Sequence, residues 1–181
     1  MISPEKSERG ALTPTSFAIL ALVDQLGEAS SYDLKVALEN SVRHFWPIPH
    51  TTAYEEPARL ALAGLLSSRQ QPSGRRRRCY ALTQPGKEAL NRWVQEPLAA
   101  APQLRDELWL KVFAGADPVT LLTQRIDFYR SHIAALEADL VTRRSSERGN
   151  GPEHALRAVL ELNRMLLCTA EEICDVASPR G

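Results

Sequence analysis

The chain has 181 residues, 44% hydrophobic and 24% charged, which is enough for one large domain or two small ones with a buried core. Its net charge is zero, but residues 1–95 hold 12 basic and 9 acidic residues (+3), whereas residues 96–181 hold 10 and 13 (−3), a division that suits a polyanion-binding module joined to a different region. No N-terminal segment resembles a signal peptide and no apolar run reaches the roughly 18 residues of a membrane span, so we expect a cytoplasmic protein without membrane partners.

Local signals predict where the first two helices begin. Thr13-Pro14 indicates the start of a helix that is apolar nearly all round and ends at Gly27. Ser30 and Asp33 have the spacing of a capping box, which predicts a second helix through about residue 42.

A third helix follows the segment FWPIPH at residues 45–50, whose two prolines exclude a helix there. It begins at about residue 52, where Thr52 and Glu55 are spaced for another capping box, and Gly64 ends it. Pro57 lies inside this helix and removes one backbone hydrogen bond, so we expect a distorted first turn.

A basic hairpin comes directly after the third helix. Residues 65–70 and 79–82 are predicted strands, joined through the turn residues Pro-Ser-Gly and four consecutive arginines. Thr83 then caps a fourth helix that runs to about residue 95. A helix followed by a basic hairpin is the order of a winged helix-turn-helix, which places one helix in the DNA major groove and the hairpin along the phosphates.

The second half of the chain changes in character. Residues 96–101 are predicted to be a linker, followed by helices at about 104–113, 117–144 and 153–176. The two long helices carry apolar residues at steps of three and four. Because two such helices cannot bury both apolar stripes against each other completely, we expect a homodimer.

The predicted fold class is therefore mainly α with a small β-hairpin wing. We expect a disordered tail at residues 1–10, a winged helix-turn-helix DNA-binding domain at 11–95, and a dimerisation domain of antiparallel helices at 96–181.

Ten residues are candidates for contact with double-stranded DNA. Guanidinium groups at a hairpin tip form charge-assisted bonds with phosphates, and hydroxyl groups at a helix start also suit phosphates. The alternatives are a solvated charged turn for the arginines, a packed aromatic for Tyr54, and surface residues without a role for the two on the second helix. The candidates are Tyr32, Lys35, Thr51, Thr52, Tyr54, Arg59, Arg75, Arg76, Arg77 and Arg78.

Other chemistry has little support in the sequence. Three cysteines and four histidines show no metal-ligand or nucleophile spacing, and we expect small apolar packing roles for the cysteines, no cofactor, no metal ion and no enzymatic activity. Trp109 and Phe113 are candidates to line a pocket for an aromatic ligand, while Trp46 and Trp93 are expected to pack in the core.

The sequence resembles the PadR family of transcriptional regulators over about residues 12–94. The resemblance rests on FWP, the tyrosine at position 54, AGLL, YALT and the Gly-Lys-x-x-Leu motif that begins at position 86. It implies a winged-helix homodimer on a pseudo-palindromic operator, often a repressor that a small molecule such as a phenolic acid releases. Two features depart from the family pattern: Pro57 in the recognition helix, where many members have leucine, and four consecutive arginines in the wing. The alternative is a winged-helix protein–protein interaction module that does not bind DNA.

Overall fold

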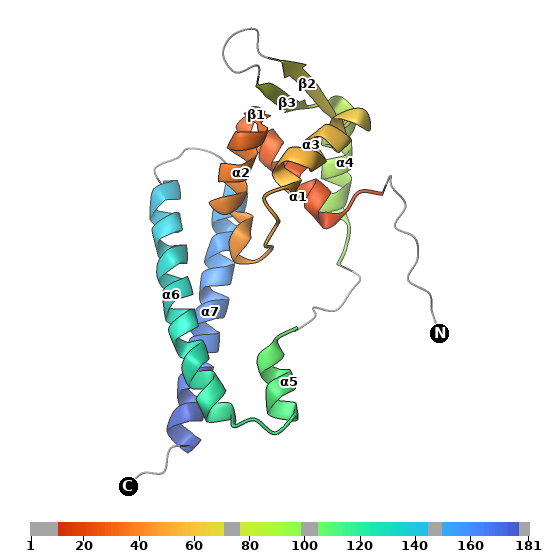
Figure 1. Cartoon of the computed structure of the whole chain (residues 1–181). Coiled ribbons are helices and arrows are strands. Elements are labelled where there is room, and N and C mark those ends of the chain that lie inside the picture. Colours follow the sequence, from red (N-terminus) through yellow and green to blue (C-terminus); the bar gives the residue numbers. More distant parts are fainter. Residues whose placement is uncertain (1–10, 71–76, 99–104, 145–149, 178–181) are drawn as a thin grey trace, which may run out of the picture. The chain divides into compact units, whose positions relative to one another are not determined.

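The computed structural model describes residues 11–70, 77–98, 105–144 and 150–177, which form two compact units divided after Pro97 (Figure 1). Within these ranges the chain is mainly helical with one small antiparallel sheet, which confirms the predicted fold class. The predicted tail at residues 1–10 and the turn at the hairpin tip lie outside the described residues.

The first unit packs its helices around a core of aliphatic side chains. Ile19, Leu20 and Val23 in the first helix are fully buried, as are Leu34 and Leu60 in the next two. The helices are α1 (Pro14–Leu26), α2 (Ser31–Glu39), a 3-10 helix η1 (Val42–His44), α3 (Thr52–Leu62) and α4 (Gln84–Gln95).

The sheet of this unit has three strands in the order β1-β3-β2: β1 (Glu28–Ser30), β2 (Leu66–Gln70) and β3 (Arg78–Leu82). The hairpin of β2 and β3 was predicted to within one residue at each end. β1 was not predicted, because three residues show no alternation of polar and apolar side chains. It forms because Ala29 pairs with Tyr80 across the sheet, and both side chains are buried.

Local capping places α2 and α4 as the sequence predicts. The Ser30 N–H donates to Asp33 Oδ2 at 2.9 Å, and the Asp33 N–H donates to Ser30 Oγ at 3.3 Å, so both halves of the predicted capping box are present. Thr83 Oγ1 accepts from the Gly86 N–H at 3.2 Å and caps α4.

The predicted capping box of α3 is wrong. The helix begins at Thr52, but neither Thr51 nor Thr52 makes a side-chain cap. The N–H groups of Thr52 and Glu55, which the box would use, donate instead to the carbonyls of Pro49 and Thr51, at 3.0 and 3.1 Å. The backbone turn before the helix therefore supplies the acceptors that a cap would supply.

Two glycines meet specific backbone requirements in the first unit. Gly64 has a φ of 75° and ends α3 in a Schellman arrangement, in which the N–H of Leu65 donates to the carbonyl of Leu60 at 3.0 Å. Gly86 lies against the backbone of Leu65, just before β2: a Cβ atom at position 86 would overlap the carbonyl oxygen of Leu65. The helix α3 itself runs through Pro57 without interruption, and the proline ring is buried.

The second unit consists of α5 (Glu107–Phe113), α6 (Pro118–Arg144) and α7 (Asn150–Ala177). α6 and α7 are antiparallel (Figure 1), and the ion pairs Arg130–Glu171 and Arg164–Glu137 join them, each at 2.7 Å. Four of their buried leucines form one cluster near the α6–α7 turn (Leu136, Leu140, Leu156 and Leu160), whereas Leu122 of α6 belongs to another cluster with Leu108 of α5. α5 starts later than predicted, because Asp106 acts as its N-cap by accepting from the Leu108 N–H at 3.0 Å.

The predicted core positions of two tryptophans are wrong. Trp46 and Trp93 are 46% and 38% exposed. The Trp93 ring stacks on Phe17 with centroids 4.7 Å apart, and Trp46 Nε1 donates to Thr15 Oγ1 at 3.3 Å. Both rings therefore lie on the outside of the first unit, where the amphipathic indole can keep contact with water. Among the cysteines, Cys79 is buried in β3 as expected, whereas Cys168 is exposed.

Candidate nucleic-acid interface

The exposed face of α3 is the first part of a candidate interface. Ala53, Pro57 and Leu60 form the buried face of α3, and the side chains at its other positions are fully or partly exposed. Thr51 and Tyr54 are exposed at its amino end, and the Tyr54 side chain is 51% exposed. Exposed hydroxyl groups at the amino end of a helix can donate to an anion such as a phosphate, whereas the first N–H groups of α3 already donate to backbone carbonyls.

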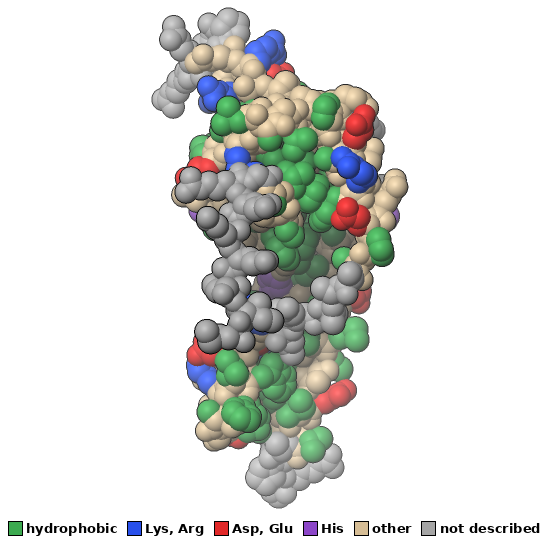
Figure 2. All heavy atoms as spheres, turned by 90° about the vertical axis from the view of Figure 1, so that its right-hand side faces the viewer, with side chains coloured by type: hydrophobic (Ala, Val, Ile, Leu, Met, Phe, Trp, Pro, Cys, Tyr) green, Lys and Arg blue, Asp and Glu red, His purple; other side chains and the backbone are tan. Residues whose placement is uncertain are grey.

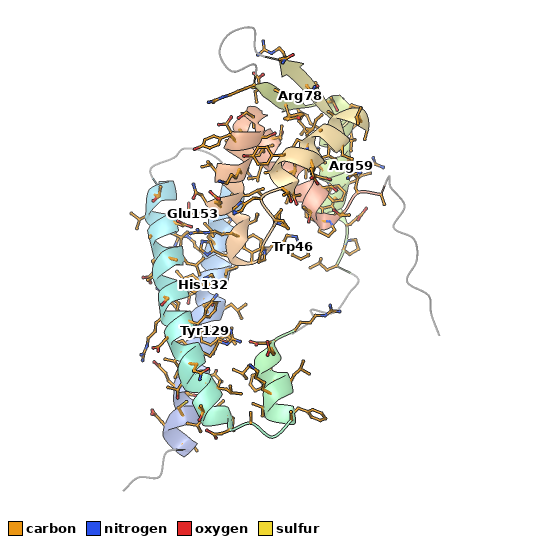
Figure 3. The ribbon with its side chains drawn as sticks, in the orientation of Figure 1. Trp46, Arg59, Arg78, Tyr129, His132 and Glu153 are labelled. Atoms are coloured by element: carbon orange, nitrogen blue, oxygen red, sulfur yellow. The ribbon has the colours of Figure 1, made fainter. Side chains whose placement is uncertain are left out.

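The hairpin of β2 and β3 is the second part. Arg77 and Arg78 are exposed where β3 begins, and Arg78 pairs with Gln70 at the turn end of the hairpin (Figure 3). Arg75 and Arg76 lie outside the described residues. Figure 2 shows Lys and Arg side chains in blue at this end of the first unit. Exposed guanidinium groups beside a hairpin tip can approach a phosphate backbone without a loss of core packing.

The first turn of α2 lies within electrostatic range of Arg77 on the hairpin. Hydrogen bonds from the Ser30 side chain and backbone lower the pKa of Asp33, and the charge of Arg77 lowers it further. Tyr32 in the same turn is 58% exposed. Lys35 lies one turn further on, with its Nζ 3.6 Å from Glu39 Oε1. The two α2 candidates are therefore on the surface. Lys35 forms a half-exposed ion pair with Glu39, which contributes little to stability.

Arg59 differs from the other candidates, because its guanidinium is directed into the unit (Figure 3). Its Nε and one terminal nitrogen donate to the two carboxylate oxygens of Glu56 at 2.9 and 2.6 Å. The same terminal nitrogen donates to Ser16 Oγ of α1 at 3.0 Å. Contact of Arg59 with a phosphate or a guanine edge through its Nε or this terminal nitrogen would require these bonds to break.

The sequence did not indicate the hydrogen-bond partner Ser16 of Arg59 or the ion-pair partner Glu28 of Arg69. Ser16 is fully buried and 43 positions away from Arg59, so no spacing rule connects them. Arg69 on β2 is a further exposed cation of the hairpin and pairs with Glu28 of β1 at 3.1 Å. Its place on the wing follows from the predicted strand, but its partner follows only from the unpredicted β1.

The predicted ligand-binding aromatics lie on α5. Trp109 is 47% exposed and Phe113 is 91% exposed. A shallow pocket of the second unit lies nearby, but Trp109 and Phe113 are not among its lining residues. It is lined by Glu107, Leu108, Lys111, Leu121, Gln124, Arg125 and Phe128.

Within the described ranges, no group of three His, Cys, Asp or Glu side chains could hold a metal ion. Of the described helices, none combines the length and the apolar character that a membrane crossing needs.

Comparison with known proteins gives a consistent result for the first unit. Residues 19–92 match the model of the "Transcriptional regulator PadR-like family". The negative transcriptional regulator PadR of Bacillus subtilis (strain 168) is 29% identical over 99 residues, and this match spans 54% of each chain, about half the length of that relative. The family and this relative are described as transcriptional regulators, which agrees with the expectation that the chain is not an enzyme.

Solved structures extend the likeness to nearly the whole chain. The crystal structure of Bacillus subtilis PadR in complex with operator DNA has a TM-score of 0.77 and 22% identity, and the match covers 90% of this chain and 98% of the other. The same protein in complex with p-coumaric acid has a TM-score of 0.73 and 22% identity, with 92% and 98% covered. At these identities the likeness establishes the fold.

Proposed function

We propose that this chain, whose residues 19–92 match the model of the PadR-like family of transcriptional regulators, binds DNA as a homodimer and represses transcription in the cytoplasm. The observation that carries the proposal is the joint exposure of the amino end of α3 and of Arg77 and Arg78 on the hairpin. In this assignment α3 reads the major groove and the hairpin arginines bind phosphates. The relative of the same fold that was crystallised with operator DNA supports the DNA-binding part of this proposal.

The homodimer is supported by a second apolar stripe on α7. One stripe faces α6 and is buried or half-buried; it includes Leu156, Leu160 and Ala170. The other runs at steps of four and three, is apolar except for Thr169, and leaves its side chains exposed: Leu162, Leu166, Thr169, Ile173 and Val176. An exposed stripe with heptad spacing is typical of a helix that packs against another chain. Two protomers joined in this way would present two α3 helices to a pseudo-palindromic operator.

A small aromatic acid is the proposed class of effector. The relative bound to p-coumaric acid supports this class. In the second unit, Leu108, Leu121 and Phe128 supply apolar walls to the shallow pocket, and Lys111 and Arg125 supply positive charge. Arg125 is already paired with Asp106 at 2.5 Å, so a bound carboxylate would have to share or replace that partner.

The test is a titration of the full-length chain against the DNA upstream of its own gene, measured by fluorescence anisotropy at low salt. Saturable binding that exceeds binding to a random-sequence duplex, and that p-coumaric acid weakens, is the expected result. Binding that the acid leaves unchanged would remove the proposed effector class and leave the DNA-binding assignment. Absence of binding to both duplexes at low salt would overturn the DNA-binding assignment and favour a protein–protein interaction module.

A further inference from the structure

The recognition helix α3 is tied to α1 by a small polar cluster inside the first unit. Its members are Glu56, Arg59 and Ser16, which we call the anchor cluster. Arg59 donates two bonds to the carboxylate of Glu56 in a fork, at 2.9 and 2.6 Å, and a third to Ser16 Oγ at 3.0 Å. Paired bonds of this kind fix the relative orientation of both groups, because the guanidinium and the carboxylate are planar.

Ser16 has an equally defined environment at the start of α1. Its side chain is fully buried, and its Oγ accepts from the Thr13 N–H at 2.9 Å. The Ser16 N–H donates in return to Thr13 Oγ1 at 3.2 Å, which completes the capping box of α1. The anchor cluster therefore connects the middle of α3 to the rigid first turn of α1 and not to a mobile side chain.

The charges of the cluster balance inside the unit. The Glu56 side chain is only 15% exposed and that of Arg59 is 33% exposed. Burial raises the pKa of Glu56, but hydrogen bonds from Arg59 and Ser16 outweigh burial and leave the pKa below its ordinary value. Removal of Arg59 toward a phosphate would leave a largely buried carboxylate without its counter-charge, which is unfavourable.

We propose that the anchor cluster is a positioning device that holds α3 at a fixed angle on α1, and that Arg59 does not itself contact DNA. The inference rests on the proposed DNA-binding function. The consequence concerns sequence discrimination: the exposed side chains of α3 reach base edges only if the helix axis is held in place, whereas the wing arginines hold phosphates whatever the base sequence. Loss of the cluster should reduce specificity and leave the electrostatic part of binding intact.

The experiment compares Arg59→Gln and Glu56→Gln with Glu88→Gln, a control that removes one exposed carboxylate from α4 of the same unit. Each full-length variant is titrated against the duplex that the wild-type chain selects from a random pool and against a random duplex of equal length, over a range of salt concentrations. Thermal unfolding confirms that each variant is folded at the temperature of the titration.

The positioning role predicts the same change for both cluster variants. The ratio of specific to random affinity falls by about tenfold, the size of one lost base-pair readout. The dependence of random-duplex affinity on salt stays that of the wild type, and the control keeps the wild-type ratio. Arg59→Lys keeps the charge but lacks the fork, so its ratio should fall as well.

If Arg59 contacts a phosphate directly, Arg59→Gln and Glu56→Gln should change DNA affinity in opposite directions, and that result would overturn the inference. Arg59→Gln would then weaken both duplexes equally and make the salt dependence shallower, whereas Glu56→Gln would free Arg59 and strengthen both. If either glutamine variant fails to fold, Arg59→Lys decides alone, since a phosphate contact would survive that change. Lower thermal stability with an unchanged ratio would also overturn the inference. If the wild-type chain selects no duplex, the proposed function itself fails.

Discussion

Replacement of the wing arginines should change how DNA affinity depends on salt. Arg77 and Arg78 are exposed at the start of β3, so the double variant Arg77→Ala/Arg78→Ala removes two cations per protomer without a change in the core. In a homodimer this removes about four phosphate contacts, and the slope of log affinity against log salt should become shallower by about 3.6. Over a fourfold rise in salt, the wild type should therefore lose about 150-fold more affinity than the variant.

The assay is fluorescence anisotropy on a random-sequence duplex at several salt concentrations. The control is Lys111→Ala/Arg157→Ala, which removes two exposed cations from the second unit, each paired there with a glutamate four residues earlier. The control should keep the wild-type slope. Equal slopes for the wild type and the Arg77→Ala/Arg78→Ala variant would refute the assignment of these arginines to phosphates.

Four further predictions concern stability and assembly. Ser30→Ala removes the capping box of α2 and should lower the free energy of unfolding by about 1 kcal/mol in urea denaturation; a change below about 0.3 kcal/mol would show that the cap is not needed. The folded-state pKa of Asp33 is depressed, so its stabilising contribution is present above the unfolded pKa of about 3.9 and is lost as the pH falls through the folded value. Thermal melts across this acidic range should therefore show a weaker pH dependence for Asp33→Asn than for the wild type, and identical profiles would contradict this assignment. Leu60→Ala empties a fully buried site and should cost about 2–5 kcal/mol in urea denaturation, so a cost below about 1 kcal/mol would contradict the core assignment. Leu166→Glu places a charge in the exposed stripe of α7 and should give a monomer in light scattering, with Met165→Glu beside the stripe as the milder comparison; a wild-type mass for Leu166→Glu would place the dimer contact elsewhere.

Features set by residues close together in the sequence were predicted well. Ser30 and Asp33 lie three positions apart and form their capping box inside one turn, so the sequence contains all of the information. The same holds for Thr83 at the start of α4 and for Gly64 at the end of α3. The predicted α3 capping box failed because the N–H groups of Thr52 and Glu55 donate to the carbonyls of Pro49 and Thr51, and the course of that turn depends on the fold.

Features set by distant residues could not be predicted from one sequence. The strand β1 exists because Ala29 meets Tyr80, and Arg59 is held by Ser16 because α1 packs on α3. The ion pair of Arg59 with Glu56 has helical i,i+3 spacing, but no pattern of residue types near Arg59 indicates its bond to Ser16. Part of the candidate interface was therefore predicted in outline, while the hydrogen bonds that distinguish Arg59 from the exposed wing arginines required the structure.

Photo-crosslinking from the exposed face of α3 tests whether this helix lies on the DNA. Tyr54 is replaced by the photoreactive p-benzoylphenylalanine, which keeps an aromatic ring at a position that is half exposed. The same residue is placed at Phe113, an exposed aromatic position of the second unit, as the control. We expect the yield of crosslinking to the selected duplex to be well above that of the position-113 control when the probe is at position 54. Equal yields at the two positions, with the duplex bound, would contradict the placement of α3 on DNA.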